Sequence, residues 1–159
     1  MQIETRSMTL SGVTTENRTI TGIAVPYKSS SKLLNDRPRP YREEFRQGAF
    51  KDIDENVALY LQHDHKGLPL ARVGAGTISF TESERGLLFS AQLPESRGDI
   101  AEAVARGDIA GVSIGFSSLS DDWNHRSGSM PSTRIVKSAR LFELSLVANP
   151  AYPGATIDS

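Results

Sequence analysis

The sequence predicts a mainly β protein of about seven strands with flanking helices, and three observations favour this class. Most apolar residues either alternate with polar ones or run for a few positions between turn residues, which is typical of sandwich and barrel strands. Only one segment has helix-capping residues at both its start and its end. A chain of 159 residues can bury a sizeable core, so a single domain over residues 1–159 is expected.

Seven segments carry the strand pattern, and turn-forming residues separate them. In chain order they are 2–10, 17–26, 57–63, 70–80, 86–93, 110–118 and 134–147. Residues 81–86, Thr-Glu-Ser-Glu-Arg-Gly, separate two of these segments and end in a glycine, which hairpin turns favour. A tight β-hairpin is therefore expected at this position.

A helix is predicted over residues 99–106. Asp99 can cap its first turn, Glu102 stands at the reciprocal position of a capping box, and Gly107 can end it. These signals lie at both ends of a short segment, so this is the best-defined local element of the sequence.

A second, short helix is expected within residues 42–53, where Phe45 and Phe50 would dock on the sheet and Gly48 would weaken the helix.

The segments 27–40 and 120–134 are rich in Ser, Pro, Gly and charge. Such composition favours mobile loops.

Composition excludes several functions. Lys and Arg number 18 against 19 Asp and Glu, so the formal charge of −1 provides no field to attract nucleic acid or an anionic membrane. The absence of cysteine excludes thiol catalysis and thiolate ligands, and it fits a cytosolic compartment. No signal peptide pattern and no run of about 20 apolar residues is present. A soluble protein without membrane or nucleic-acid partners is expected.

Two of the three histidines lie in residues 61–70, Leu-Gln-His-Asp-His-Lys-Gly-Leu-Pro-Leu. His63 would continue the inward row of the predicted strand, while Asp64 would point the other way. His65 returns to the first face only if the strand has not yet turned. Zinc takes three or four protein ligands and the third histidine, His125, lies in a polar segment, so no metal site is expected. A structural histidine is the alternative.

Residues 111–115, Gly-Val-Ser-Ile-Gly, match the G-x-S-x-G pattern of a nucleophile elbow. That elbow needs a strand, turn and helix, whereas this serine lies within a β-like run and follows the histidines, so the elbow is rejected. Ser113 instead shares one strand face with small residues only, and an extended peptide could approach it closely. The alternative is a strand whose glycines ease packing.

Glu143 lies in a strongly apolar predicted strand, on one face with Leu141, Ser145 and Val147. Burying a carboxylate there is costly unless it is paired. A histidine would serve as partner, with one ring nitrogen facing Glu143 and the other taking the proton of Ser113. A solvated edge residue is the alternative.

Six stretches together resemble the prohead (capsid maturation) protease family of tailed phages, a relative of the herpesvirus assemblins. In order they are GIAVPY, EEFRQGAF, LQHD followed by LPL, ERGLLFSAQL, GVSIGF and LFELSLVANPAYPGA. The resemblance places the family's catalytic histidine on His63 and its nucleophile on Ser113. The third member falls on Glu143, in a strand where the herpesvirus enzymes place a second histidine.

The resemblance implies an assemblin-like closed β-barrel flanked by helices, without a cofactor or metal. It implies a serine endopeptidase that cleaves scaffold and capsid-protein segments, and itself, inside the assembling procapsid in the host cytoplasm. By analogy with the herpesvirus enzymes, self-association into a dimer or larger assembly is expected. One alternative is a non-catalytic assembly module that binds scaffold with the same barrel. A second is a metal-dependent hydrolase centred on His63, Asp64 and His65.

Two departures from the family pattern affect this interpretation. Where the herpesvirus enzymes carry an arginine cluster that helps to hold the oxyanion, residues 148–152 read Ala-Asn-Pro-Ala-Tyr. Backbone amides near Gly115 or around Asn149, or water held by Arg140, are the candidate donors. Family members usually continue beyond the last motif, so a chain ending at Ser159 is interpretable as a trimmed catalytic core.

Overall fold

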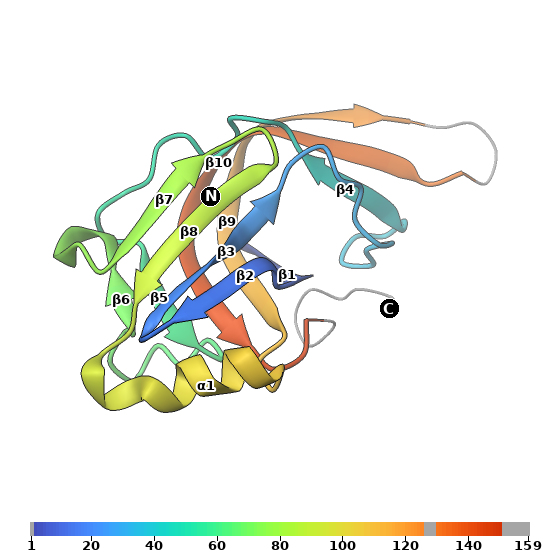
Figure 1. Cartoon of the computed structure of the whole chain (residues 1–159). Helices are drawn as coiled ribbons and strands as arrows, with labels where there is room; N and C mark the ends of the chain where they lie inside the picture. Colours follow the sequence, from blue (N-terminus) through green and yellow to red (C-terminus); the bar gives the residue numbers. More distant parts are fainter. Residues whose placement is uncertain (1, 126–129, 151–159) are drawn as a thin grey trace.

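The computed structural model describes residues 2–125 and 130–150 and is drawn in Figure 1. It contains one α-helix, two short 3-10 helices and ten strands. In chain order the elements are β1 (Glu4–Thr9), β2 (Ser11–Glu16), β3 (Thr19–Pro26), β4 (Tyr41–Phe45), β5 (Ala58–Leu61), β6 (Ala71–Arg72), η1 (Val73–Ala75), β7 (Ile78–Glu82), β8 (Gly86–Gln92), η2 (Glu95–Arg97), α1 (Gly98–Arg106), β9 (Gly111–Asn124) and β10 (Ser132–Val147).

The strands form two open sheets (Figure 1). One has the order β1-β9-β10-β5-β6, with β4 also paired to β10, and the other has the order β2-β3-β8-β7. The mainly β class is confirmed, but the predicted closed barrel is wrong for the described residues. The chain crosses between the sheets four times, at Leu10, between β3 and β4, at η1, and between β8 and β9.

The core lies between the two sheets. On β9, Val112, Ile114 and Phe116 are fully buried, as the alternation of the sequence predicts. They belong to one apolar cluster with residues of the other sheet and of β10, which include Ile20, Val25, Leu87, Phe89, Ala91, Leu144 and Leu146. The opposite face of β9, which carries Ser113, is therefore turned away from this core.

The expected helix within residues 42–53 is wrong, because a strand takes its place. Strand β4 pairs in parallel with the start of β10 and buries Tyr41, Glu43 and Phe45 on alternate positions. The buried Glu43 carboxylate is neutralised by the guanidinium of Arg6, at 2.8 Å. Pairing with a distant strand thus outweighs local helix propensity.

The expected loop over residues 120–134 is largely strand. Strand β9 continues to Asn124 and β10 begins at Ser132, so the two form a long arm that projects from the sheets (Figure 1). Residues 126–129 of this expected loop lie outside the described residues. In the other expected loop, Leu34 forms an isolated bridge with Tyr41. The expected strand 70–80 is split into β6 and β7 by η1.

Helix α1 confirms the prediction for residues 99–106, except at its first turn. Arg97 rather than Asp99 is the N-cap and makes no side-chain cap, so the predicted capping box is wrong. Asp99 pairs with Arg97 instead, at 3.1 Å. Gly107 ends the helix in the left-handed conformation, with φ of 87°. No helix among the described residues is long and apolar enough to cross a membrane.

The two glycines that flank α1 offer a matched test of backbone strain. A Cβ added at Gly98 or at Gly107 would meet nothing within 4 Å, so only the backbone conformation distinguishes them. Gly107→Ala is expected to lower the free energy of unfolding by about 1–2 kcal/mol. Gly98→Ala is expected to leave it unchanged or raise it by up to about 1 kcal/mol. Urea denaturation measures both, and equal losses would contradict the expectation.

Candidate active site

The three residues singled out from the sequence lie together in the structure. His63 Nε2 is 2.9 Å from Ser113 Oγ, and His63 Nδ1 is 3.0 Å from Glu143 Oε1. The imidazole therefore lies between the hydroxyl and the carboxylate. These distances are those of a nucleophile, base and orienting acid in a row.

A β-bulge in β10 brings Glu143 to this face. Leu141 lies opposite Phe116, whereas Glu143 lies opposite Gly115, because the register shifts between Leu141 and Glu143. Without the extra residue, Glu143 would lie opposite Ile114 and point into the core. The prediction that Leu141 shares the face of Glu143 is wrong for the same reason. The bulge thus lets one strand bury leucines and present a carboxylate.

The small residues of β9 make room for parts of the same chain. A Cβ at Gly115 would lie 3.0 Å from Glu143 Cγ, and a Cβ at Gly111 would lie 2.7 Å from Pro150 Cβ. These glycines therefore leave space for Glu143 and Pro150, and not for the approaching peptide that was expected. Ser113 itself has no exposed surface.

His63 reaches the site from a turn rather than from a strand. Strand β5 ends at Leu61, and both Gln62 and His63 have left-handed backbones, with φ of 53° and 56°. Such conformations are costly for residues other than glycine and cluster at functional sites. Hydrogen bonds hold them in place, from the Gln62 amide to the Leu146 carbonyl at 2.9 Å and from the His63 amide to Ser145 Oγ at 3.2 Å.

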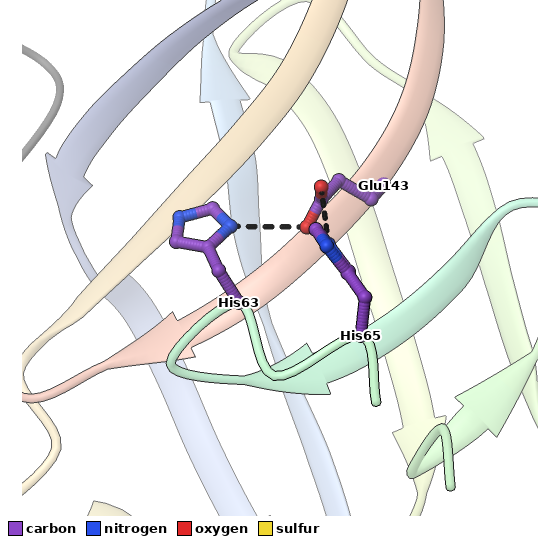
Figure 2. A group of neighbouring side chains, drawn as sticks. All are labelled: His63, His65 and Glu143. Atoms are coloured by element: carbon purple, nitrogen blue, oxygen red, sulfur yellow. Dashed lines mark hydrogen bonds and ion pairs between the residues drawn. The ribbon is translucent and has the colours of Figure 1, made fainter. Parts of the chain in front are cut away.

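Glu143 also contacts the second histidine, and Figure 2 shows its carboxylate between the two imidazoles. His65 Nε2 is 2.6 Å from Glu143 Oε2, and its ring packs edge-on against Tyr60 at 4.8 Å between centroids. From the sequence, His65 was expected to shape the turn and to lie within reach of the site without a required chemical role. Strand alternation does not explain this contact, because β5 ends at Leu61 and the turn after it brings both imidazoles to Glu143.

Comparisons with known proteins show the family to which the chain belongs. Residues 2–159 match the model of the Caudovirus prohead serine protease family. The chain belongs to this family. It is 34% identical to the prohead protease of Enterobacteria phage HK97, over 69% of this chain and 49% of that protein. The chain thus spans about half the length of this curated relative. No solved structure matches the chain. The family resemblance seen in the sequence is confirmed.

The charge state of Glu143 follows from its surroundings in this member of the prohead protease family. Burial alone would raise the pKa of the carboxyl, but hydrogen bonds from His63 and His65 outweigh it and lower the pKa below its ordinary value of 4.5. Glu143 is therefore an anion at neutral pH. A carboxylate beside Nδ1 favours the tautomer in which Nδ1 carries the hydrogen, which leaves Nε2 free to accept from Ser113.

Other polar residues near the motifs have different places. Asp64 accepts hydrogen bonds from the amides of Lys66 and Gly67, at 3.2 and 3.3 Å, and so closes the turn after His63. Arg140 pairs with Asp54 at 3.8 Å and lies over the ring of Phe142. Neither side chain has a described contact with the three central residues.

One group of side chains has the chemistry of a metal site. The ligand atoms of His63, His65 and Glu143 lie within 4.8 Å of one another (Figure 2). Two imidazoles and a carboxylate could serve as three zinc ligands. Each imidazole contacts the carboxylate, His63 at 3.0 Å and His65 at 2.6 Å, and Asp64 of the metal-hydrolase alternative is not part of the group. His125 lies on the projecting arm, stacked on Trp123.

Proposed function

We propose that this chain is a serine endopeptidase that cleaves scaffold and capsid-protein segments, and itself, during procapsid maturation in the host cytoplasm. Ser113 is the nucleophile, His63 the general base and acid, and Glu143 the orienting carboxylate. One observation carries the proposal: the His63 imidazole lies 2.9 Å from Ser113 Oγ and 3.0 Å from Glu143 Oε1. Membership of a prohead serine protease family supports the reaction class.

The proposed reaction is acyl transfer. Ser113 Oγ attacks the carbonyl carbon of the scissile peptide bond while its proton passes to His63 Nε2. The imidazolium then returns this proton to the leaving amine, and the C–N bond breaks. Water repeats both steps on the acyl enzyme and regenerates Ser113. Throughout, Glu143 accepts from Nδ1 and stabilises the positive charge of the imidazolium.

Labelling by a fluorophosphonate tests the nucleophile without knowledge of the substrate. We expect covalent modification of Ser113, located by peptide mass spectrometry, and none in Ser113→Ala. Ser117→Ala is the matched control, since Ser117 lies on the same strand and face, is equally buried, and donates to the Gln2 carbonyl at 2.8 Å. It should be labelled like the wild type. Labelling at another residue, or none, would contradict the proposal.

Glu143→Gln separates the orienting role from the nucleophile. The neutral amide no longer stabilises the imidazolium and can favour the wrong tautomer, so we expect the cleavage rate to fall about 10³–10⁴-fold. The loss should be smaller than that of Ser113→Ala in the same assay. A wild-type rate for Glu143→Gln would assign the carboxylate a structural role only.

The second candidate is a non-catalytic assembly module that binds scaffold, and the burial of Ser113 favours it. Ser113 has 0% exposed surface, so a chain without enzymatic activity would tolerate it as a packing residue. This candidate predicts scaffold binding without fluorophosphonate labelling.

The expected self-association stays a prediction. If activity depends on it, the specific labelling rate should fall on dilution through the dissociation range, as measured beside sedimentation velocity.

A further inference from the structure

We propose that the hydroxyl of Ser7 is an oxyanion donor of this active site. The inference rests on the proposed function and adds a residue that no family motif quoted above contains. Three observations carry it: the position of Ser7 beside Ser113, the absence of a partner for its hydroxyl, and a cavity that reaches it.

Strand pairing places Ser7 next to the nucleophile. In the antiparallel pair β1 and β9, Ser7 lies directly opposite Ser113, and in the pair β9 and β10, Ser145 does. Directly opposite residues share a face and have Cβ atoms about 4.5–5.5 Å apart. The face therefore carries a row of three serines across three strands, with Ser113 in the middle.

The two neighbours of Ser113 lie on opposite flanks. His63 comes from the turn after β5, on the β10 side, and its amide hydrogen-bonds Ser145. Ser7 lies on the β1 side. During attack the leaving amine must face His63 to receive its proton, so the carbonyl oxygen points away from the imidazole. That direction is toward β1.

The Ser7 hydroxyl has no partner within the described part of the chain. The residue is 4% exposed, and Oγ forms no hydrogen bond with any described residue. The other serines on this face are paired: Ser113 with His63, Ser145 with Glu143 and Ser117 with Gln2. A buried hydroxyl without a partner destabilises a fold, and such exceptions are often functional. A substrate oxygen would supply the missing acceptor.

A cavity gives a peptide access to Ser7. It has a volume of about 410 Å³, and residues 6–9 of β1 and residues 29–32 are among those that line it. Strand β1 is an edge of its sheet, so its outer side is not covered by another strand. An extended peptide entering here would meet Ser7 immediately beside the buried nucleophile.

In the proposed step, the bond between Ser113 Oγ and the carbonyl carbon forms as the carbonyl π electrons move to oxygen. The proton of Ser113 passes to His63. Ser7 keeps its own proton and donates a hydrogen bond to the oxyanion, which is stronger than the bond to the neutral carbonyl. Ser7 therefore lowers the barrier to attack without giving up its proton.

The experiment measures the rate of fluorophosphonate labelling, because the phosphoryl oxygen of the probe occupies the same position as the oxyanion. We expect Ser7→Ala to lower the maximal labelling rate about 10²-fold and to leave the half-saturating probe concentration unchanged. Ser7→Thr, which keeps a hydroxyl, should restore most of the rate. Thr5→Ala is the control on the same strand and face, opposite Gly115, and should label normally.

Thermal unfolding distinguishes this role from a structural one. Because Ser7→Ala removes an unpartnered hydroxyl, its melting temperature should equal or exceed that of the wild type. A slow rate together with unchanged or raised stability supports the inference. An unchanged rate, or a rate that falls only as the protein unfolds, overturns it. If Ser113→Ala is still labelled or still cleaves, the proposed function fails, whatever Ser7→Ala does.

Discussion

Ser113→Ala is expected to abolish processing of the proposed substrates, scaffold and capsid proteins, when they are co-expressed with the chain. Removal of the nucleophile from a triad lowers the rate about 10⁶-fold, since no side chain is left to form the acyl enzyme. Ser113 is fully buried and loses only its hydroxyl, so the fold should persist. Intact substrate bands on gels, confirmed by mass spectrometry, would show the loss.

Ser117→Ala is again the comparison, because it removes a buried hydroxyl four residues along the same strand. It should process both substrates. Cleavage at the wild-type rate by Ser113→Ala would refute the proposed nucleophile, and circular dichroism would show that both variants are folded.

Arg134→Ala is expected to cause the largest loss of stability. Four charged side chains are buried between β1, β4 and β10, and they are Glu4, Arg6, Glu43 and Arg134. Arg134 Nη1 lies 2.8 Å from Glu4 and 3.1 Å from Glu43, while Arg6 contacts Glu43 at 2.8 Å. The arginine therefore joins β10 to both neighbouring carboxylates.

Without Arg134, the two carboxylates would share a single arginine inside the protein. Breaking a buried ion pair in this way costs about 3–5 kcal/mol. Lys137→Ala is the matched control, because Lys137 lies on the same strand and pairs with Asp122 at 3.3 Å on the surface. It should cost no more than about 1 kcal/mol. Urea denaturation measures both losses, provided that the slope of unfolding free energy against urea concentration does not change. Equal midpoints would contradict a stabilising role for the network.

Local patterns determined several elements of the fold. The alternation on β9 correctly separated Val112, Ile114 and Phe116 from the face of Ser113, because period-two patterning depends only on neighbouring residues. Gly107 ended α1 as predicted, since a left-handed residue is a local requirement. The closed barrel and the helix over 42–53 were wrong, because they depend on which distant strands pair.

The sequence by itself indicated the family and singled out His63, Ser113 and Glu143 as candidates, since strand alternation and the family motifs select the same three residues. Only the tertiary structure decided how they meet. The bulge after Leu141 turns Glu143 out of the core, and two left-handed residues replace the expected end of a strand. Strand register also places Ser7 beside Ser113. Register and backbone strain arise from contacts between segments far apart in the chain, and no local pattern encodes them.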